Sequence, residues 1–266
     1  MREETRTSSL RWLSERVRLV LAPNPSPMTL EGTNTYLIGD ERSLIVMDPG
    51  PNVDEHVASL EAAVAGANVE TIVVTHRHYD HAEAAERCAE LFGATIAGND
   101  KPARVRLSEG DRVGPLLAVA TPGHSSDHLC FLFEEERTLF SGDHILGRGT
   151  TVVAYPDGDM GAYIASLERL RDLAIDRIYP GHGPVIETPA AVIEEYIDHR
   201  LMRERQVVDG LADAPGPVTP EELVAQIYAD VDPVLHPVAA MSVRAHLAKL
   251  AREGRAVQDG ERWRPS

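Results

Sequence analysis

The sequence is short of cysteine, of aromatic residues, of positive charge and of long apolar runs. Only two of its 266 residues are cysteines, Cys88 and Cys130, and both lie in apolar stretches. Two thiols exclude a disulfide framework and suit a reducing compartment. We expect both thiols to be buried and unreactive.

Positive charge is outnumbered by negative charge along the chain. The 26 Lys and Arg residues face 42 Asp and Glu residues, which gives a formal charge of -16. Proteins that bind nucleic acid mainly through its phosphates need a basic surface. The composition therefore disfavours nucleic-acid binding as the main role, although it leaves room for a local basic patch.

Long apolar runs are also missing. No stretch approaches the ~20 apolar residues of a membrane-spanning helix. The first twenty residues contain no apolar core of the signal-peptide kind, and their glutamates fit a transit peptide poorly. These absences predict a cytoplasmic protein that does not bind a membrane.

What the sequence does contain is a regular alternation of strand-like and helix-like segments, which predicts mixed α/β layers. A pair of apolar runs around a charged turn predicts a hairpin over residues 128–143. The other predicted strands are 17–22, 35–39, 43–48, 70–75, 94–97, 116–121 and 176–179. The predicted helices are 54–65, 82–92, 159–173 and 189–209.

The composition changes near residue 210. Residues 210–220, GLADAPGPVTP, hold two glycines and three prolines, which is typical of a linker or turn cluster. Two helical stretches follow, at 219–231 and 236–254, and then a short hairpin around Asp259-Gly260. This outline predicts two domains, a catalytic one over 1–209 and a winged-helix-like one over 210–266.

Metal-capable side chains gather in the segment THRHYDH, residues 75–81, directly after a predicted strand. His76 and His78 alternate past the strand end, so both imidazoles can point to one side. Asp80 and His81 fall where the next helix begins. One metal ion could take the first two side chains and a second ion the last two. Imidazole and carboxylate suit zinc, and also iron or manganese.

Three further candidate ligands lie at predicted strand-to-loop junctions. His124 lies in TPGHSSDH, Asp143 in LFSGDHIL and His182 in IYPGHGPV. Each has a glycine beside it, which lets the backbone approach an ion closely. Active sites of layered α/β folds gather at such strand ends.

Together these segments resemble the ligand series of the metallo-β-lactamase superfamily. The resemblance implies an αββα sandwich with two divalent metal ions, zinc by availability. It assigns His76, His78 and His124 to the first ion. It assigns Asp80, His81 and His182 to the second ion, with Asp143 bridging the two. An aspartate at the bridging position is typical of the hydrolase and nuclease branches, so hydrolysis of β-lactam antibiotics is not expected.

Three flanking motifs resemble one subgroup more narrowly. They are NPSPMTLEGTNTYLIG, SGDHILGRGTTV and YIDHRLMRERQ. The subgroup includes the mitochondrial endoribonuclease beta-lactamase-like protein two and carries a C-terminal winged helix. One departure is visible. Many members of the superfamily have Gly-Gly where this chain has Glu83 and Ala84, which raises a question about helix packing and substrate access.

The implied mechanism is attack by a metal-bridging hydroxide, with Asp80 and Asp143 as the catalytic carboxylates. Asp48 is interpreted either as a partner of a ligand histidine or as a turn former before Pro-Gly. Thr33 and Asn34 either line the cleft or bond at a strand entry. Four further residues are weaker candidates. His144 is expected to face away from the site, and His128 to begin a strand. His199 and Arg200 could contact phosphate or substrate, and Arg200 could instead form a helix-surface salt bridge.

Three substrate hypotheses follow. The leading one is cleavage of single-stranded RNA, supported by the subgroup and by a net +3 over residues 241–266. The second is a glyoxalase II-like or other thioesterase acting on a small ester or thioester. The third is a nucleic-acid-binding regulator with structural metals, which an open site with seven ligands disfavours. The sequence leaves the oligomeric state open.

Overall fold

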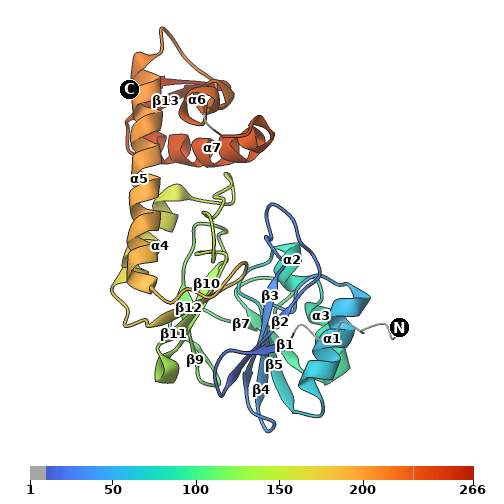
Figure 1. Cartoon of the computed structure of the whole chain (residues 1–266). Helices are drawn as coiled ribbons and strands as arrows, with labels where there is room; N and C mark the ends of the chain where they lie inside the picture. Colours follow the sequence, from blue (N-terminus) through green and yellow to red (C-terminus); the bar gives the residue numbers. More distant parts are fainter. Residues whose placement is uncertain (1–9, 230) are drawn as a thin grey trace, which may run out of the picture. The chain divides into compact units, whose positions relative to one another are not determined.

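The computed structural model describes residues 10–229 and 231–266 and divides the chain into two compact units (Figure 1). Unit 1 comprises the residues up to Ala120, Asp127–Gly149 and Ile175–Glu187. Unit 2 comprises Thr121–Ser126, Thr150–Ala174 and Thr188–Ser266. The domain boundary predicted at residues 209 and 210 falls inside one helix of unit 2, and that boundary stays a prediction.

Unit 1 contains two sheets. The seven-stranded sheet has the order β1-β2-β3-β4-β5-β6-β7, and the five-stranded sheet has the order β12-β11-β10-β9-β8. The strands of the first sheet are β1 (Leu10–Trp12), β2 (Val17–Leu21), β3 (Asn34–Gly39), β4 (Leu44–Met47), β5 (Val69–Val73), β6 (Thr95–Gly98) and β7 (Val105–Arg106). Those of the second are β8 (Arg112–Val113), β9 (Leu116–Ala120), β10 (Leu129–Phe133), β11 (Thr138–Gly142) and β12 (Arg177–Pro180).

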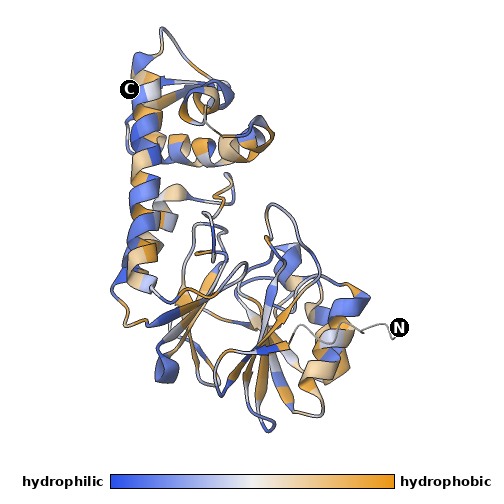
Figure 2. Ribbon diagram, in the orientation of Figure 1, coloured by the Kyte–Doolittle hydropathy of each residue, from blue (hydrophilic) through white to orange (hydrophobic). Residues whose placement is uncertain are grey.

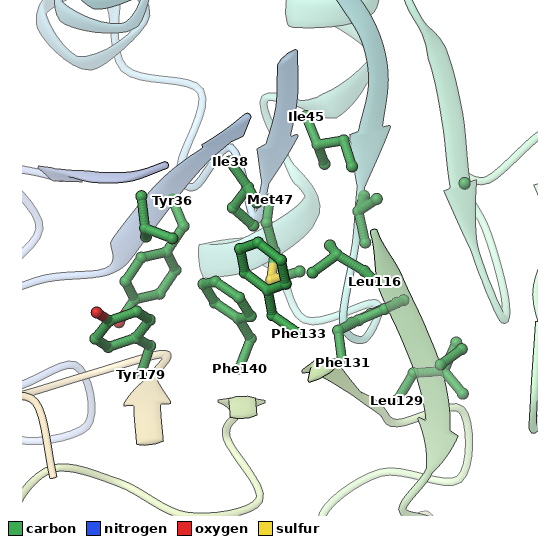
Figure 3. Close-up of a cluster of buried hydrophobic side chains, with 14 of the residues drawn as sticks. Tyr36, Ile38, Ile45, Met47, Leu116, Leu129, Phe131, Phe133, Phe140 and Tyr179 are labelled. Atoms are coloured by element: carbon green, nitrogen blue, oxygen red, sulfur yellow. The ribbon is translucent and has the colours of Figure 1, made fainter. Parts of the chain in front are cut away.

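The core of unit 1 lies between the two sheets. Tyr36 and Met47 from the first sheet pack with Phe131, Phe140 and Tyr179 from the second (Figure 3). On its other face the seven-stranded sheet is covered by α1 (Asp54–Val64) and α3 (Ala85–Phe92). Strands buried on both faces show as apolar segments along the ribbon (Figure 2).

Parallel pairing places strand ends from distant parts of the sequence side by side. β4 and β5 are parallel neighbours, so the residues after Met47 and after Val73 meet at one sheet edge. β11 and β12 are also parallel, and the Gly181 N–H donates to the Gly142 carbonyl at 2.8 Å. The predicted ligands follow these strand ends, and the fold therefore supplies the edge on which a site can form.

Unit 2 is built from helices and a two-stranded wing. Its elements are α4 (Met160–Arg171), α5 (Pro189–Asp213), α6 (Pro220–Ile227), η2 (Pro233–Leu235), α7 (His236–Arg252), β13 (Ala256–Asp259) and β14 (Arg262–Pro265). Thr219 and Glu222 form a capping box that starts α6. Val207 and Leu211 of α5 enter the same core cluster as α6, α7 and the wing, together with Trp263.

The region after the histidine-rich segment differs in one respect from the prediction. The helix predicted over 82–92 is α3, which begins later, at Ala85; a separate short helix, α2 (Tyr79–Ala82), precedes it, and Glu83 and Ala84 join the two. Both joining residues have right-handed helical backbone angles, so glycine is not required there. Ala84 is fully buried against the helix layer, and the Glu83 carboxylate accepts from the Asn52 N–H.

The buried cysteines match the expectation. Cys88 and Cys130 are free and buried, and burial raises the pKa of the Cys88 thiol to about 11. A thiol with so high a pKa is a poor nucleophile at neutral pH.

Across residues 10–229 and 231–266, none of the helices combines the length and apolar character needed to cross a bilayer.

Candidate metal centre

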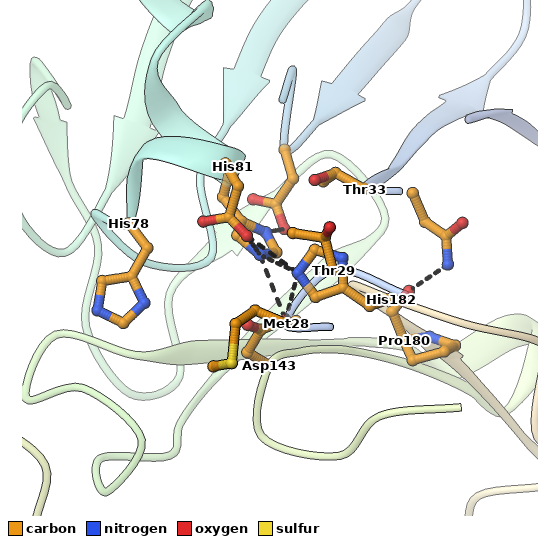
Figure 4. Close-up of polar contacts among 12 residues, drawn as sticks. Met28, Thr29, Thr33, His78, His81, Asp143, Pro180 and His182 are labelled. Carbon is orange, nitrogen blue, oxygen red and sulfur yellow. Dashed lines mark hydrogen bonds and ion pairs between the residues drawn. The ribbon is translucent and has the colours of Figure 1, made fainter. Parts of the chain in front are cut away.

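Four side chains converge in unit 1: Asp80 and His81 of α2, Asp143 after β11, and His182 after β12 (Figure 4). The Nε2 atoms of His81 and His182 lie 3.2 Å apart. Asp143 Oδ1 lies 3.3 Å from His81 Nε2 and 3.4 Å from His182 Nε2. Asp80 Oδ2 lies 3.1 Å from His182 Nε2 and 3.7 Å from His81 Nε2.

The far nitrogen of each ring determines which lone pair faces the cluster. His81 Nδ1 lies 2.9 Å from the Asp48 carboxylate, and His182 Nδ1 lies 3.1 Å from the Gly32 carbonyl. Both partners only accept hydrogen bonds, so each Nδ1 carries the proton. The two Nε2 atoms therefore point at each other and at two carboxylates, and each can bind a metal ion once it releases its proton.

The donor set fits a divalent cation. Ligands about 2.0–2.2 Å from one tetrahedral ion are roughly 3.3–3.6 Å apart. The spacings of 3.1 to 3.7 Å within the cluster bracket that range. Asp80 keeps 29% of its side chain exposed, whereas both histidines are fully buried, so the cluster is open to solvent on the Asp80 side.

The pKa values reflect the negative charge of the cluster. Burial lowers the pKa of His182. The Asp143 carboxylate and the hydrogen bonds to Asp143 and Asp80 raise it by more, so the pKa is about 9. Burial also opposes protonation of His81, yet Asp143, Asp48 and Asp80 raise its pKa well above the ordinary value. The site thus attracts positive charge strongly.

Asp48 orients two of the predicted ligands, His81 directly and His76 through Thr75. Besides bonding His81, its carboxylate accepts from the Thr75 N–H and the Thr75 hydroxyl, each at 2.8 Å. Because that hydroxyl proton is used, the Thr75 oxygen accepts from His76 Nδ1 at 3.0 Å. Asp48 is 2% exposed and has a φ of 49°, a left-handed backbone that is uncommon outside glycine. Asp48 is therefore the hydrogen-bond partner of a predicted ligand histidine, His81, as the first of its two interpretations expected.

The other three predicted ligands divide between the units. In unit 1, His76 Nε2 lies 3.0 Å from His78 Nδ1, so these two rings present nitrogens to one point. His124 belongs to unit 2, where its Nδ1 donates to the Val152 carbonyl at 2.7 Å. Its Nε2 is therefore the nitrogen that can bind a metal. The assignment of these three side chains to one ion stays a prediction.

Gly181 leaves the room that the cluster occupies. A Cβ atom at this position would lie 2.6 Å from Asp143 Oδ1 and 2.7 Å from His81 Cε1. Every other residue type would displace a ligand, which explains the glycine beside His182.

Asn34 and His128 hydrogen-bond to the backbone close to two predicted ligands. Asn34 is 3% exposed and donates to the carbonyls of Pro180 and Gly183, which flank His182. His128 precedes β10, as expected, but its Nε2 also accepts from the Asp143 N–H at 3.2 Å. Sequence analysis missed this second contact because the two residues meet only through the β10–β11 pairing.

The expectation of a helix-surface salt bridge at Arg200 of α5 is wrong. Arg200 is 3% exposed and donates to the Thr151 carbonyl, so it is neither a helix-surface residue nor open to a ligand. His199 is half-buried, and burial together with Arg200 and Arg203 lowers its pKa to about 4. A neutral imidazole keeps one N–H donor, and the contact of His199 with phosphate or substrate stays a prediction.

The basic residues near the C-terminus are paired with acids. This holds for five of the six that produced the predicted net positive charge, all within unit 2. The pairs are Arg244–Glu221, Lys249–Glu204, Lys249–Glu253, Arg252–Asp159, Arg255–Glu204 and Arg262–Glu222.

Comparison with family models gives two matches. The metallo-beta-lactamase superfamily model matches residues 28–111 and 96–182. The model of the beta-lactamase associated winged helix domain matches residues 219–263, which span α6, α7 and most of the wing.

Individual proteins with similar sequences include a beta-lactamase-like protein 2 homolog from Caenorhabditis elegans. It is 38% identical, with 94% of this chain and 89% of the relative covered. An atrochrysone carboxyl ACP thioesterase from Aspergillus fumigatus is 35% identical, and the match covers 81% of this chain and 74% of the relative. A crystal structure of a metallo-beta-lactamase family protein from Thermus thermophilus has a TM-score of 0.81 at 23% identity, covering 96% of this chain and 100% of that one.

Proposed function

Because the chain belongs to the metallo-β-lactamase superfamily, a superfamily of metal-dependent hydrolases, we propose that it hydrolyses a small thioester with two divalent ions. The observation that carries the proposal is the cluster of Asp80, His81, Asp143 and His182, whose four ligand atoms lie within 4.8 Å of one another. Zinc is the proposed metal, and the same ligands suit iron or manganese.

Bound cations of this kind supply a hydroxide nucleophile at neutral pH and stabilise the developing negative charge of the substrate. The chain's own residues arrange that chemistry. Asp48 holds the rings of His81 and, through Thr75, His76 in one orientation. Asp143 approaches both buried histidines of the cluster, which suits a ligand of the ion that these histidines would hold. Asp80 is the most exposed carboxylate of the cluster and the one placed to exchange a proton with water.

Two observations favour a thioester. A fungal relative of 35% identity is named as a thioesterase. In addition, the bases that would contact RNA phosphates are paired with acids in unit 2, and the chain carries a formal charge of -16. A small thioester needs few phosphate contacts, whereas an RNA strand needs many.

Single-stranded RNA is the second candidate. The similarity to the beta-lactamase-like protein 2 homolog extends over 94% of the chain, including the winged helix, and favours it. A phosphodiester could be attacked by the same nucleophile.

The test uses the purified, metal-assayed full chain with three substrates: S-lactoylglutathione, a simple acetyl thioester and a short single-stranded RNA. We expect thioester turnover that disappears in the Asp143→Ala variant, and intact RNA. RNA cleavage that depends on Asp143, with both thioesters untouched, would reverse the order of the candidates. A fully metal-loaded chain that hydrolyses none of the three would contradict both.

A second experiment tests RNA alone. Arg244 and Arg262 lie in exposed ion pairs, so reversing their charge leaves the buried groups of unit 2 in place. If RNA is the substrate, R244E/R262E should lower RNA cleavage in a salt-dependent manner and spare thioester turnover. Equal effects on both substrates would argue against a nucleic-acid role for this surface.

A further inference from the structure

We propose that Arg200 of α5 and Arg252 of α7 are positioning residues that fix His124 for metal binding. The inference rests on the proposed function, because it concerns one of the seven ligands. All the contacts that carry it lie within unit 2.

A backbone carbonyl orients the ring of His124. Its Nδ1 donates to Val152 O at 2.7 Å, which leaves the Nε2 lone pair for an ion. Histidine ligands commonly use such a contact to fix their tautomer and ring orientation. The position of the Val152 carbonyl therefore sets the direction of the ligand, and Val152 lies in a segment without regular secondary structure.

Arg200 holds that segment from α5. Its guanidinium donates to the carbonyl of Thr151, the residue before Val152, and lies 5.2 Å from the ring centre of Tyr163 in α4. Arg200 is 3% exposed and Thr151 is 2% exposed, so water does not compete for this hydrogen bond. A planar guanidinium held between a carbonyl and an aromatic ring has little freedom to move.

A second connection reaches the backbone of His124 from α7. Arg252 pairs with the Asp159 carboxylate at 2.6 Å, and this carboxylate also caps α4 by accepting from the Ala162 N–H. The Asp159 N–H donates to the Gly123 carbonyl at 2.8 Å. Gly123 immediately precedes His124, so the pair formed by Arg252 acts one residue from the ligand.

Gly123 shows how closely this backbone is packed. It has a φ of +147°, and a Cβ atom there would lie 2.3 Å from Tyr163 Cα. The peptide before His124 therefore lies directly on α4, whose aromatic ring Arg200 covers. Arg200 thus holds the segment whose carbonyl orients the His124 ring, and Arg252 acts on the backbone through Gly123, the residue before His124.

The experiment measures metal affinity rather than turnover. Arg200→Met keeps the length of the side chain and removes the donor, and Arg205→Met on the exposed face of α5 is the matched control. Zinc affinity of the full chain is measured by chelator competition, and the two sites are resolved by cobalt spectra. R200M should weaken one metal equivalent about tenfold to a hundredfold and leave the other unchanged. R200K should recover part of the loss, and R205M should match the wild type.

Arg252→Gln provides a milder variant if R200M folds poorly, because the pair with Asp159 is partly exposed. It should weaken the same equivalent about threefold, whereas Arg244→Gln, which breaks another exposed pair on α7, should have no effect. Affinities are compared at a temperature where thermal unfolding shows every variant to be folded.

The His124→Ala variant separates this inference from the proposed function. Loss of one equivalent in H124A with wild-type affinity in R200M and R252Q would overturn the positioning role alone. Equal weakening of both equivalents in R200M would overturn it too, since that result indicates a general loss of stability. If H124A binds two ions as the wild type does, the ligand assignment is wrong and the inference fails with it.

Discussion

A cluster of charged side chains around Asp143 in unit 1 and another around Glu204 in unit 2 differ in charge balance. In unit 1, two carboxylates meet two histidines whose Nε2 atoms face inward. In unit 2, the Glu204 carboxylate lies 2.7 Å from Lys249 Nζ, 3.1 Å from Arg255 and 3.7 Å from His246.

The difference shows how a binding site can be distinguished from a structural ion pair. His246 and Lys249 lower the pKa of Glu204 to about 2, so that cluster compensates its own charge. In unit 1 the pKa of His182 rises to about 9 because the carboxylates are not compensated. An uncompensated buried charge is costly unless a ligand supplies the opposite charge, and such a cluster therefore indicates function.

The comparison is tested most strongly by two buried histidines. His81 and His246 are both at most 1% exposed, and each lies beside a carboxylate. H81A should lose a metal equivalent and at least about a thousandfold in kcat/KM. H246A should keep hydrolysis within about threefold and lower the free energy of unfolding by about 2 kcal/mol. Metal analysis, kinetics and urea unfolding check both variants. Similar losses of activity in the two would remove the distinction between the clusters.

Glu204→Gln tests the balance within unit 2. Lys249 and Arg255 each pair with both Glu204 and Glu253. Removing the Glu204 carboxylate leaves Glu253 as the acid that they share. The free energy of unfolding should fall by about 3 kcal/mol. The control is Glu195→Gln on the exposed face of α5, which should change it by less than about 0.5 kcal/mol. Equal stability of the two variants would mean that the cluster contributes nothing to the fold.

The pH dependence of the same variant sharpens the comparison. The folded pKa of Glu204, about 2, is below its unfolded value of ~4.3. Its stabilising contribution is therefore fully present above the unfolded pKa and is lost as pH falls towards 2. The difference in unfolding free energy between wild type and E204Q should be smaller at pH 3 than at pH 7. Urea titrations of both proteins with metal removed measure it, and a constant difference would contradict the shift.

The smallest effect is expected for an exposed pair. Arg244 and Glu221 keep 41% and 59% of their side chains exposed, so solvent screens their attraction. R244Q should change the free energy of unfolding by under about 0.5 kcal/mol and leave thioester turnover unchanged. Urea unfolding and steady-state kinetics check both values. A loss comparable to that of E204Q would show that exposed pairs matter as much as buried ones here.

Much of the fold could be predicted because its signals are local. The strands predicted at 17–22, 35–39 and 43–48 are confirmed as β2, β3 and β4, and the hairpin over 128–143 is confirmed as β10 and β11. In contrast, β1, β7 and β8 were not predicted. They contain two or three residues each, mostly exposed, and so carry no usable periodicity.

A ligand of the site could be predicted where the feature that marks it, a strand end or a neighbouring glycine, is adjacent to it in the sequence. The strand-end histidines and the glycine beside His182 are such cases. The partners of those ligands were harder to find, because Asp48 reaches His81 across 33 residues and Gly32 reaches His182 across 150. Arg200 was misinterpreted because its helix reads as amphipathic, and only the packing of α5 shows which face is buried.

The charge count near the C-terminus had the same weakness. The bases were summed along the sequence, but their partners come from elsewhere: Glu221 lies 23 residues from Arg244 and Asp159 lies 93 residues from Arg252. Counting charge along a segment cannot show which charges are already compensated.

The chain passes between the two units five times, at residues 120–121, 126–127, 149–150, 174–175 and 187–188. No single crossover between genes could therefore add or remove unit 2 as a whole. A lineage that lost α6, α7 and the wing would keep α5 with Val207 and Leu211 stripped of their apolar neighbours. We therefore expect related chains to differ in the loops of unit 2 and to inherit its helices together.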